Sequence, residues 1–261
     1  MVGVDRAGVG AARPNFVIRE RLVAGTTCVL DESAARHMRV LRLDPGASVG
    51  VRDGQGAVAD GRLARLSKTQ AFVELDAVEM VAPLPSVHLL VPVADRDRML
   101  SLAEKSCELG LTSWRPVLWH RSKSVSPRGE GIVFQGKTRA RMEGALAQSE
   151  GAWLPQIYPE ASADRAALAT PPGDRILLLP GGPPLAGPDA APLTEPVTFA
   201  LGPEGGFEQA EIDALLEAGF RIASLSGSIL RFETAGIVAL GIARTLLGAG
   251  SPHFDAPTAH D

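Results

Sequence analysis

The stretch LGPEGGF at residues 201–207 lies between a segment typical of a buried strand and a segment typical of a helix. An apolar run at residues 197–201 leads into it, and residues 208–218 repeat their apolar positions with the period of a helix. In an open α/β sheet, a turn at the carboxyl end of a strand lies where ligands bind. Glycines let the backbone come close to a ligand and present N–H groups to it. The spacing matches neither GxGxxG nor the Walker loop, and a purely structural turn is the alternative.

A second strand, glycine loop and helix follow at residues 225–235, which read LSGSILRFETA. Arg231 and Glu233 fall where the helix is expected to begin. Charged residues at this position commonly serve the helix end itself, through capping and the helix dipole. Taken alone, the segment indicates a helix start, and beside the first glycine loop it becomes a second candidate binding loop.

Around these loops, the second part of the chain alternates strands and helices. Strand-like runs occupy residues 86–93, 114–119, 175–179, 196–201 and 221–225. Helical patterns occupy residues 95–109, 138–149, 208–218 and 232–247. This order predicts an α/β domain with a mostly parallel sheet over residues 81–250. The helix at 237–247 is apolar on more than one side, which favours a dimer, although full burial within one chain is the alternative.

The first part of the chain has a different pattern. Short strand-like runs at residues 16–18, 26–30, 47–53, 57–66 and 71–78 are separated by the turns DPG at 44–46 and DGQG at 53–56. Asp31 is placed to cap a short helix. Five short strands at this spacing predict a small β-barrel over residues 13–80. Residues 1–12 and 251–261 are expected to be flexible tails.

Composition bounds the class of protein. The chain has 261 residues, of which 45% are hydrophobic, and this is enough for a real core. Its two cysteines, Cys28 and Cys107, exclude a disulfide-stapled scaffold and a structural zinc site, and we expect both to be buried in a reducing cytosol. No segment has the length and apolarity of a membrane span or a signal peptide. We therefore expect a cytoplasmic protein without a metal.

Charge is distributed unevenly along the chain. Residues 1–145 hold 21 Lys and Arg against 16 Asp and Glu, a net charge of +5, and residues 146–261 hold 5 against 14, a net charge of −9. A basic front favours the binding of a polyanion, although an unevenly charged solvated surface gives the same pattern. The candidate RNA contacts are Arg36, His37, Arg39, Arg42, Arg96, Arg98, Lys105, Arg121 and Lys123. Alternatively, Arg39 and Arg42 pair only with Asp44 and Asp53.

Five motifs in this order resemble the RsmE family of SPOUT-class RNA methyltransferases over about residues 13–247. HMRVLR at 37–42, with the two turns at 44–46 and 53–56, resembles that family's PUA-like RNA-binding barrel. EKSCELG at 104–110 resembles its EKxxELG helix, and Gln148-Ser149 with Pro155 resembles its QS…P segment. GPEGGF at 202–207 and ILRFETA at 229–235 resemble its two cofactor loops.

The resemblance implies a C-terminal SPOUT α/β methyltransferase domain with a deep trefoil knot, S-adenosylmethionine as cofactor and a homodimer. It implies methylation of N3 of a uridine in the 16S ribosomal RNA of the small subunit. The cofactor contacts it assigns are Leu179, Pro180, Gly181, Leu201, Gly202, Pro203, Glu204, Gly205, Gly206, Leu225, Ser226, Ser228, Ile229, Leu230, Thr234 and Ala235.

Uracil N3 carries a proton at neutral pH, so an enzyme of this kind must remove that proton or stabilise the resulting anion. We expect Arg231 to stabilise negative charge on the uracil carbonyl oxygens. Either Glu204 or Glu233 is expected to take the proton, and the sequence does not choose between them. The target base must also leave its stack to reach the site.

The chain departs from the family pattern at four places. The usual Glu before Gln148 is Ala147, and the usual Arg after Ser149 is Gly151. The LGxR before ILR is LSGS at 225–228, and the Thr before Glu233 is Phe232. Two alternatives therefore stay open: a SPOUT-class methyltransferase with another RNA target, and a non-catalytic RNA-binding protein of ribosome assembly.

Overall fold

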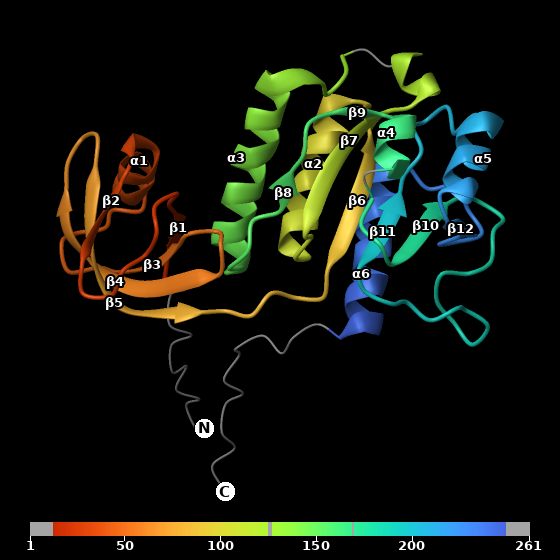
Figure 1. Cartoon of the computed structure of the whole chain (residues 1–261). Helices are drawn as coiled ribbons and strands as arrows, with labels where there is room; N and C mark the ends of the chain where they lie inside the picture. The colour runs from red at the N-terminus through yellow and green to blue at the C-terminus, as the bar shows by residue number, and fades with distance from the viewer. Residues whose placement is uncertain (1–12, 125–126, 169, 249–261) are drawn as a thin grey trace, which may run out of the picture. The chain divides into compact units, whose positions relative to one another are not determined.

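The computed structural model describes residues 13–124, 127–168 and 170–248, so the predicted tails at 1–12 and 251–261 lie outside the described residues. The chain divides into two compact units (Figure 1). Unit 1 comprises Met1–Ala82 and Ala147–Ala152, and unit 2 comprises Pro83–Leu146 and Trp153–Asp261. No pattern in the sequence indicates that the short segment Ala147–Ala152 groups with the first unit.

Unit 1 is a curled five-stranded sheet with one helix. The strands β1 (Asn15–Val17), β2 (Thr27–Leu30), β3 (Ser48–Arg52), β4 (Ala57–Leu66) and β5 (Ala71–Met80) are ordered β1-β3-β4-β5-β2. In β4, buried and exposed positions alternate as a half-buried strand requires. The buried side chains form one core, which includes Leu30, Met38, Val51, Leu63 and Val73. The predicted small β domain is confirmed as a curled sheet, and among the described residues β1 and β2 are its outermost strands.

Helix α1 (Glu32–Val40) forms because both of its ends are determined locally. The Asp31 side chain accepts a hydrogen bond from the Ala34 N–H at 3.0 Å, as predicted for an N-cap. At the other end Leu41 caps the helix, and Arg42 follows with φ of 57°, the left-handed conformation that usually ends a helix at glycine. Ala35 and Met38 are buried, so the arginines of this helix point away from the core.

The segment Ala147–Ala152 is bound to unit 1 by backbone and side-chain contacts. The Gly56 N–H donates to the Ala152 carbonyl at 3.0 Å. Arg52 is buried, donates to the Asn15 Oδ1 at 3.1 Å, and has the Glu150 carboxylate at 3.8 Å. Burial lowers the pKa of Arg52, and the nearby Glu150 charge opposes that shift.

Unit 2 is built on a parallel sheet. Its strands are β6 (Val87–Pro92), β7 (Ser113–Leu118), β8 (Gln156–Ile157), β9 (Ala161–Ser162), β10 (Asp174–Leu178), β11 (Val197–Ala200) and β12 (Phe220–Ala223). The order is β12-β10-β11-β6-β7-β8, with β9 also paired to β7, and every pairing is parallel. The predicted α/β domain with a mostly parallel sheet is confirmed. Strand order does not test the predicted trefoil knot, which stays a prediction.

Five helices and a short 3-10 turn complete the described part of unit 2. They are α2 (Arg96–Glu108), η1 (His120–Ser124), α3 (Gly131–Ser149, whose last three residues belong to unit 1), α4 (Ala163–Leu168), α5 (Gln209–Glu217) and α6 (Phe232–Leu247). Helix α6 packs on α2, and Gly236 permits this because a Cβ there would lie 2.7 Å from Leu102. Arg244 of α6 is buried and donates to the carbonyls of Leu109, Gly110 and Pro85, so it closes the end of α2.

Several sequence predictions need correction here. Helix α3 begins at Gly131 rather than at Thr138, because the first two turns contain Gly131 and Gly136, and glycine weakens a helical pattern in the sequence. Strands β8 and β9, helix α4 and η1 were not predicted, since two-residue strands and one-turn helices show no periodicity. Cys107 is buried as expected, but Cys28 is only half-buried, on the edge strand β2.

Candidate functional site

Parallel strands bring their carboxyl ends to one edge of the sheet, here called the carboxyl edge: the ends of β6, β10, β11 and β12 with the segments that follow them. A cavity of about 400 Å³ lies at this edge, above β10 and β12. It is lined by Gly181, Pro184, Leu185, Ala186, Ser224, Leu225, Ser226, Gly227 and Ile242. Its size falls within the range of pockets that hold small molecules.

The two loops that form this cavity are held together by their own backbones. The Leu179 N–H donates to the Ala223 carbonyl at 3.0 Å, and the Leu185 N–H donates to the Ser224 carbonyl at 2.9 Å. The Ser224 hydroxyl donates to the Gly182 carbonyl at 2.7 Å. Gly182 is required for this approach, because a Cβ there would lie 2.6 Å from Ile222. The cavity is therefore built largely from backbone, which glycine allows to come close.

The cavity includes only part of the predicted cofactor set. Gly181, Leu225 and Ser226 line it, whereas the predicted residues of the loop 201–206 and of the start of α6 do not. The lining residues that the sequence did not single out are Pro184, Leu185, Ala186, Ser224, Gly227 and Ile242. The Gly-Gly-Pro-Pro run at 181–184 is a sequence signal for a loop that includes Pro184, Leu185 and Ala186. No sequence signal distinguishes Ile242 within an apolar helix.

The glycine-rich loop after β11 is held by the segment that follows β7. The Arg121 guanidinium donates to the Gly205 carbonyl at 2.7 Å. Trp119 and Phe207 meet edge to face, with ring centroids 4.8 Å apart. The positive φ in this loop, 73°, belongs to Gly206, whereas Gly205 is confined by Arg121, whose Cβ lies 3.1 Å from a Cβ built there.

Three charged side chains meet at the carboxyl edge. Arg98 lies on α2 and bonds the Glu204 carboxylate at 3.0 Å, and its Nε lies 3.9 Å from the Glu233 carboxylate. Both candidate proton acceptors thus lie beside Arg98, which is one of the candidate RNA contacts. Arg231 is exposed at the N-cap position of α6 and makes no capping bond. Within the described residues, the guanidinium of Arg231 has no hydrogen-bond or ion-pair partner.

The predicted RNA contacts of unit 1 are exposed and uncompensated. Arg36, Arg39 and Arg42, here called the α1 surface, are all exposed. In the part of the chain that the structure describes, none of the three is in an ion pair, so the alternative pairing with Asp44 and Asp53 is not observed. The Asp53 carboxylate instead accepts the N–H groups of Gln55 and Ala57. His37 packs edge to face on Phe16.

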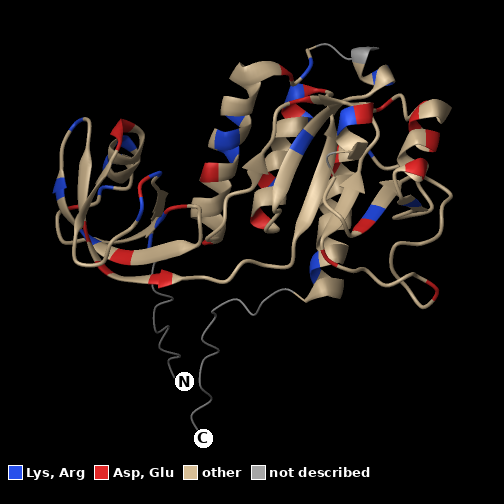
Figure 2. Cartoon of the chain, viewed as in Figure 1, with Lys and Arg blue, Asp and Glu red and all other residues tan. Residues whose placement is uncertain are grey.

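The predicted RNA contacts of unit 2 are already engaged. Lys105 lies 2.7 Å from Glu108 and 3.1 Å from Glu104, and these carboxylates raise the pKa of its ammonium. Arg96 donates to the Arg128 carbonyl at 2.7 Å, and Arg121 is held as described above. The Lys123 side chain lies outside the described residues. In Figure 2 the acidic residues of α5 in this unit are coloured red on the ribbon.

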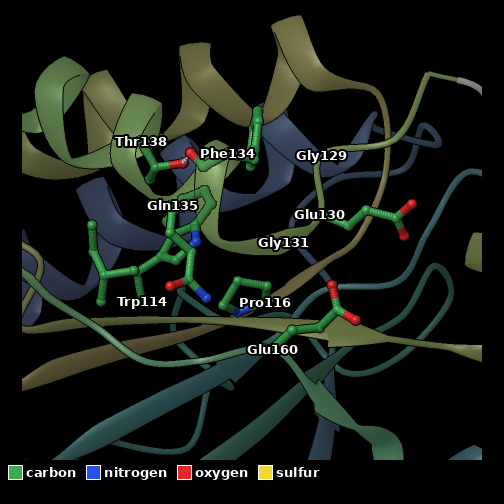
Figure 3. Close-up of a pocket in the computed structure, with 10 residues that line it drawn as sticks. Trp114, Pro116, Gly129, Glu130, Gly131, Phe134, Gln135, Thr138 and Glu160 are labelled. Carbon is green, nitrogen blue, oxygen red and sulfur yellow. Dashed lines mark hydrogen bonds between the residues drawn. The ribbon is translucent and has the colours of Figure 1, made fainter.

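A second hollow is too small to hold a ligand. It lies between the start of α3 and strand β7 and measures about 10 Å³, the space of one water molecule. Figure 3 shows the carboxylates of Glu130 and Glu160 on one side of it and Gln135 and Thr138 on the other. Burial raises the pKa of Glu160, and the charge of Glu130 adds to the shift.

Over residues 13–124, 127–168 and 170–248, no group of three His, Cys, Asp or Glu is arranged to hold a metal ion. Within the same ranges, no helix has both the length and the apolarity needed to cross a membrane.

Comparison with known proteins adds similarity in sequence and in structure. A family model described as an RNA methyltransferase domain matches residues 82–244, and one described as an RNA methyltransferase PUA domain matches residues 30–76. A curated relative from Synechocystis, named ribosomal RNA small subunit methyltransferase E, is 29% identical over 89% of this chain and 80% of its own length.

Solved structures agree with this similarity. A ribosomal RNA small subunit methyltransferase E from Neisseria gonorrhoeae, bound to S-adenosylmethionine, has a TM-score of 0.78 and 29% identity, covering 90% of this chain and 98% of that one. A protein from Thermotoga maritima, described as a predicted RNA methyltransferase, has a TM-score of 0.66 and 26% identity, covering 88% and 96%.

Proposed function

This chain belongs to the family of RNA methyltransferases that the matched domain model describes, and from that premise we propose that it transfers a methyl group from S-adenosylmethionine to N3 of a uridine in the RNA of the small ribosomal subunit. The observation that carries the proposal is the cavity at the carboxyl edge, with Arg231, Glu204 and Glu233 at the same edge. The relatives named as small-subunit ribosomal RNA methyltransferases support this choice of substrate.

The residues around the cavity fit S-adenosylmethionine. Leu185, Leu225 and Ile242 offer apolar walls for the flat adenine, and the loop backbones offer N–H and carbonyl groups for its polar edges. When bound there, S-adenosylmethionine would supply an electrophilic methyl group on a sulfonium. The solved relative from Neisseria gonorrhoeae, which holds this molecule, supports the assignment.

Arg231 has the properties required to act on the target base. Loss of the N3 proton leaves negative charge on the uracil carbonyl oxygens, and a cation beside them lowers the barrier. The guanidinium of Arg231 is exposed, and no carboxylate of the described residues neutralises it. It is therefore available to the substrate, in contrast to Arg98, which is already shared by two carboxylates.

The α1 surface is the proposed RNA-binding surface. Phosphate binding requires cations that are not already neutralised, because affinity comes from the release of counterions around the RNA. Arg36, Arg39 and Arg42 meet this condition, and Figure 2 marks the basic residues of α1 in blue. A ribosomal substrate also means that the protein acts in the cytoplasm.

The proposed active form is a homodimer. Ile229, in the loop before α6, is 86% exposed, and Leu246, near the end of α6, is 52% exposed. These side chains lie at the two ends of α6, whose sequence is apolar on more than one side, and the helix as a whole supports association with a second copy. Light scattering at micromolar concentration tests this: a dimer mass is expected, and a monomer mass would contradict it.

The test of the proposed function has two parts. Calorimetry with S-adenosylmethionine is expected to show binding by the purified protein. Incubation with radiolabelled S-adenosylmethionine and small ribosomal subunits lacking the modification, followed by digestion to nucleosides, is expected to yield 3-methyluridine. Label in another nucleoside would assign a different target, and the absence of both binding and label would identify a non-catalytic relative.

A further inference from the structure

The two carboxylates beside Arg98 differ in how they are satisfied. One oxygen of Glu204 accepts a hydrogen bond from Arg98 at 3.0 Å, and the Glu204 side chain is 31% exposed to solvent. The Glu233 side chain is only 16% exposed, and the Arg98 Nε, at 3.9 Å, is beyond hydrogen-bond distance. Glu204 is thus held by a charged hydrogen bond and by water, whereas Glu233 is attracted by the same cation without bonding it.

The second carboxylate oxygen of Glu233 is buried and has no hydrogen-bond partner among the described residues. Its Oε2 exposes less than 1 Å² of surface, and no donor among the described residues reaches it. A buried carboxylate oxygen without a partner is costly, and such atoms in native structures call for an explanation. A donor brought by a ligand would satisfy it. The N3–H group of uracil is a donor of this kind, and its target site is proposed for this same edge.

Chain topology explains why these residues meet. Arg98 lies in the first turn of α2, directly after β6, and Glu233 lies in the first turn of α6, after β12. Glu204 lies in the loop after β11, which is the sheet neighbour of β6. Three segments that are far apart in sequence thus place one cation between two anions, where the parallel sheet gathers its carboxyl ends.

We propose that Glu233 takes the N3 proton of the target base, that Arg98 is the positioning residue that holds Glu233 for this step, and that Glu204 serves as the counter-ion of Arg98. The inference rests on the proposed function and adds a choice between the two carboxylates that the sequence left open. Because the Glu233 Oε2 is covered in the structure, the base reaches it with a local shift of the loops at this edge.

The step balances with the groups already named. The N3–H bond breaks and its proton goes to the Glu233 Oε2. The electron pair on N3 forms the new bond to the methyl carbon, and the carbon–sulfur pair returns to sulfur, which becomes a neutral thioether. Glu233 then releases its proton to water. No oxidant, reductant or further reactant is needed.

The first test compares the two carboxylates. Glu233→Gln is expected to lower the single-turnover methylation rate by about 100-fold or more, the usual range for a lost general base. Glu204→Gln is expected to lower it by less than about tenfold, because Glu204 acts only through Arg98. The affinity of Glu233→Gln for S-adenosylmethionine, measured by calorimetry, is expected to stay within about twofold of that of the unaltered protein. A larger loss in Glu204→Gln than in Glu233→Gln would reverse the assignment.

A second readout separates a proton acceptor from a residue that merely stabilises the start of α6. RNA transcribed with 5-fluorouridine carries a more acidic N3–H, so a missing base matters less. The defect of Glu233→Gln relative to the unaltered protein is expected to shrink at least about fivefold on this RNA. An unchanged ratio would overturn the role of Glu233 in proton transfer.

The third test concerns Arg98. Arg98→Ala is expected to lower the methylation rate by about tenfold or more without changing the KM for S-adenosylmethionine, and added guanidinium ion is expected to restore part of the rate. The methylation rate of Arg98→Lys is expected to lie between those of the unaltered protein and Arg98→Ala, since lysine keeps the positive charge but lacks the planar guanidinium group. Arg141→Met is the control, because Arg141 lies on α3 and its ion pair with Glu104 of α2, at 3.2 Å, is similar in length to the pair of Arg98 with Glu204.

The outcomes distinguish this inference from the proposed function. If the unaltered protein forms no 3-methyluridine, the proposed function fails. If it does, and Arg98→Ala is no slower than Arg141→Met or is not rescued by guanidinium, the positioning role of Arg98 fails alone.

Discussion

The α1 surface and the basic residues of unit 2 have similar sequences and different environments. Both place several Lys and Arg within a short helical segment, and residues of both are candidate RNA contacts in the sequence. In the structure, Arg98 and Lys105 of α2 are neutralised by carboxylates, whereas the described part of the chain offers no such partner to Arg39 and Arg42. The difference teaches that a cation without a carboxylate partner is the better candidate for a phosphate contact. We therefore propose that unit 1 binds the RNA and that unit 2 carries out the chemistry.

The largest effect is expected at the carboxyl edge. Arg231→Ala should lower methyl transfer by about 100-fold or more, because it removes the cation that stabilises the developing uracil anion. RNA affinity should change less than about twofold. Single-turnover rates and filter binding measure the two quantities on the same preparation. A large loss of RNA affinity with a normal rate of transfer would reverse the proposed division between the units.

The cofactor cavity provides the next largest effect. In Gly182→Ala, the added Cβ would lie 2.6 Å from Ile222, so the loop must move and the cavity must change shape. We expect the Kd for S-adenosylmethionine to rise by about tenfold or more, equivalent to about 1.4 kcal/mol. Gly136→Ala is the matched control, since a Cβ there meets nothing within 4 Å. Equal affinity of Gly182→Ala and Gly136→Ala for S-adenosylmethionine would contradict the proposal that this cavity binds the cofactor.

The α1 surface should show a smaller effect that depends on salt. Replacing Arg39 and Arg42 together with Ala should weaken RNA binding and lower the slope of log affinity against log salt by up to roughly two units. Alanine keeps the Cβ of Arg42 in its left-handed conformation, so the change removes the guanidinium without altering backbone strain. If the folded double variant keeps the RNA affinity and the salt slope of the unaltered protein, the α1 surface is not the RNA-binding surface.

The smallest effect is expected for a paired cation. Lys105→Ala should change the salt slope by well under one unit, because Glu104 and Glu108 already neutralise the ammonium. Salt titrations of RNA binding beside the Arg39 and Arg42 double variant give the comparison directly. A slope change as large as one unit would mean that RNA displaces these carboxylates and that pairing is no guide to function.

Sequence reasoning was most accurate where a signal is local. The cap at Asp31, the alternation in β4 and the apolar length of α6 each depend on neighbouring residues, and each predicted element is present. The contact between Arg98 and Glu204 joins residues 106 positions apart, so no local pattern contains it. Ile242 enters the cavity only because the chain folds α6 against the loops after β10 and β12.

The central claim is tested most directly by the modification itself. Small-subunit ribosomal RNA from a strain lacking this gene would be compared with RNA from its parent by mass spectrometry of nuclease fragments. We predict that one uridine is N3-methylated in the parent, unmethylated in the deletion strain, restored by the intact gene and not restored by the Arg231→Ala gene. Identical methylation of that RNA in the parent and the deletion strain would contradict the account.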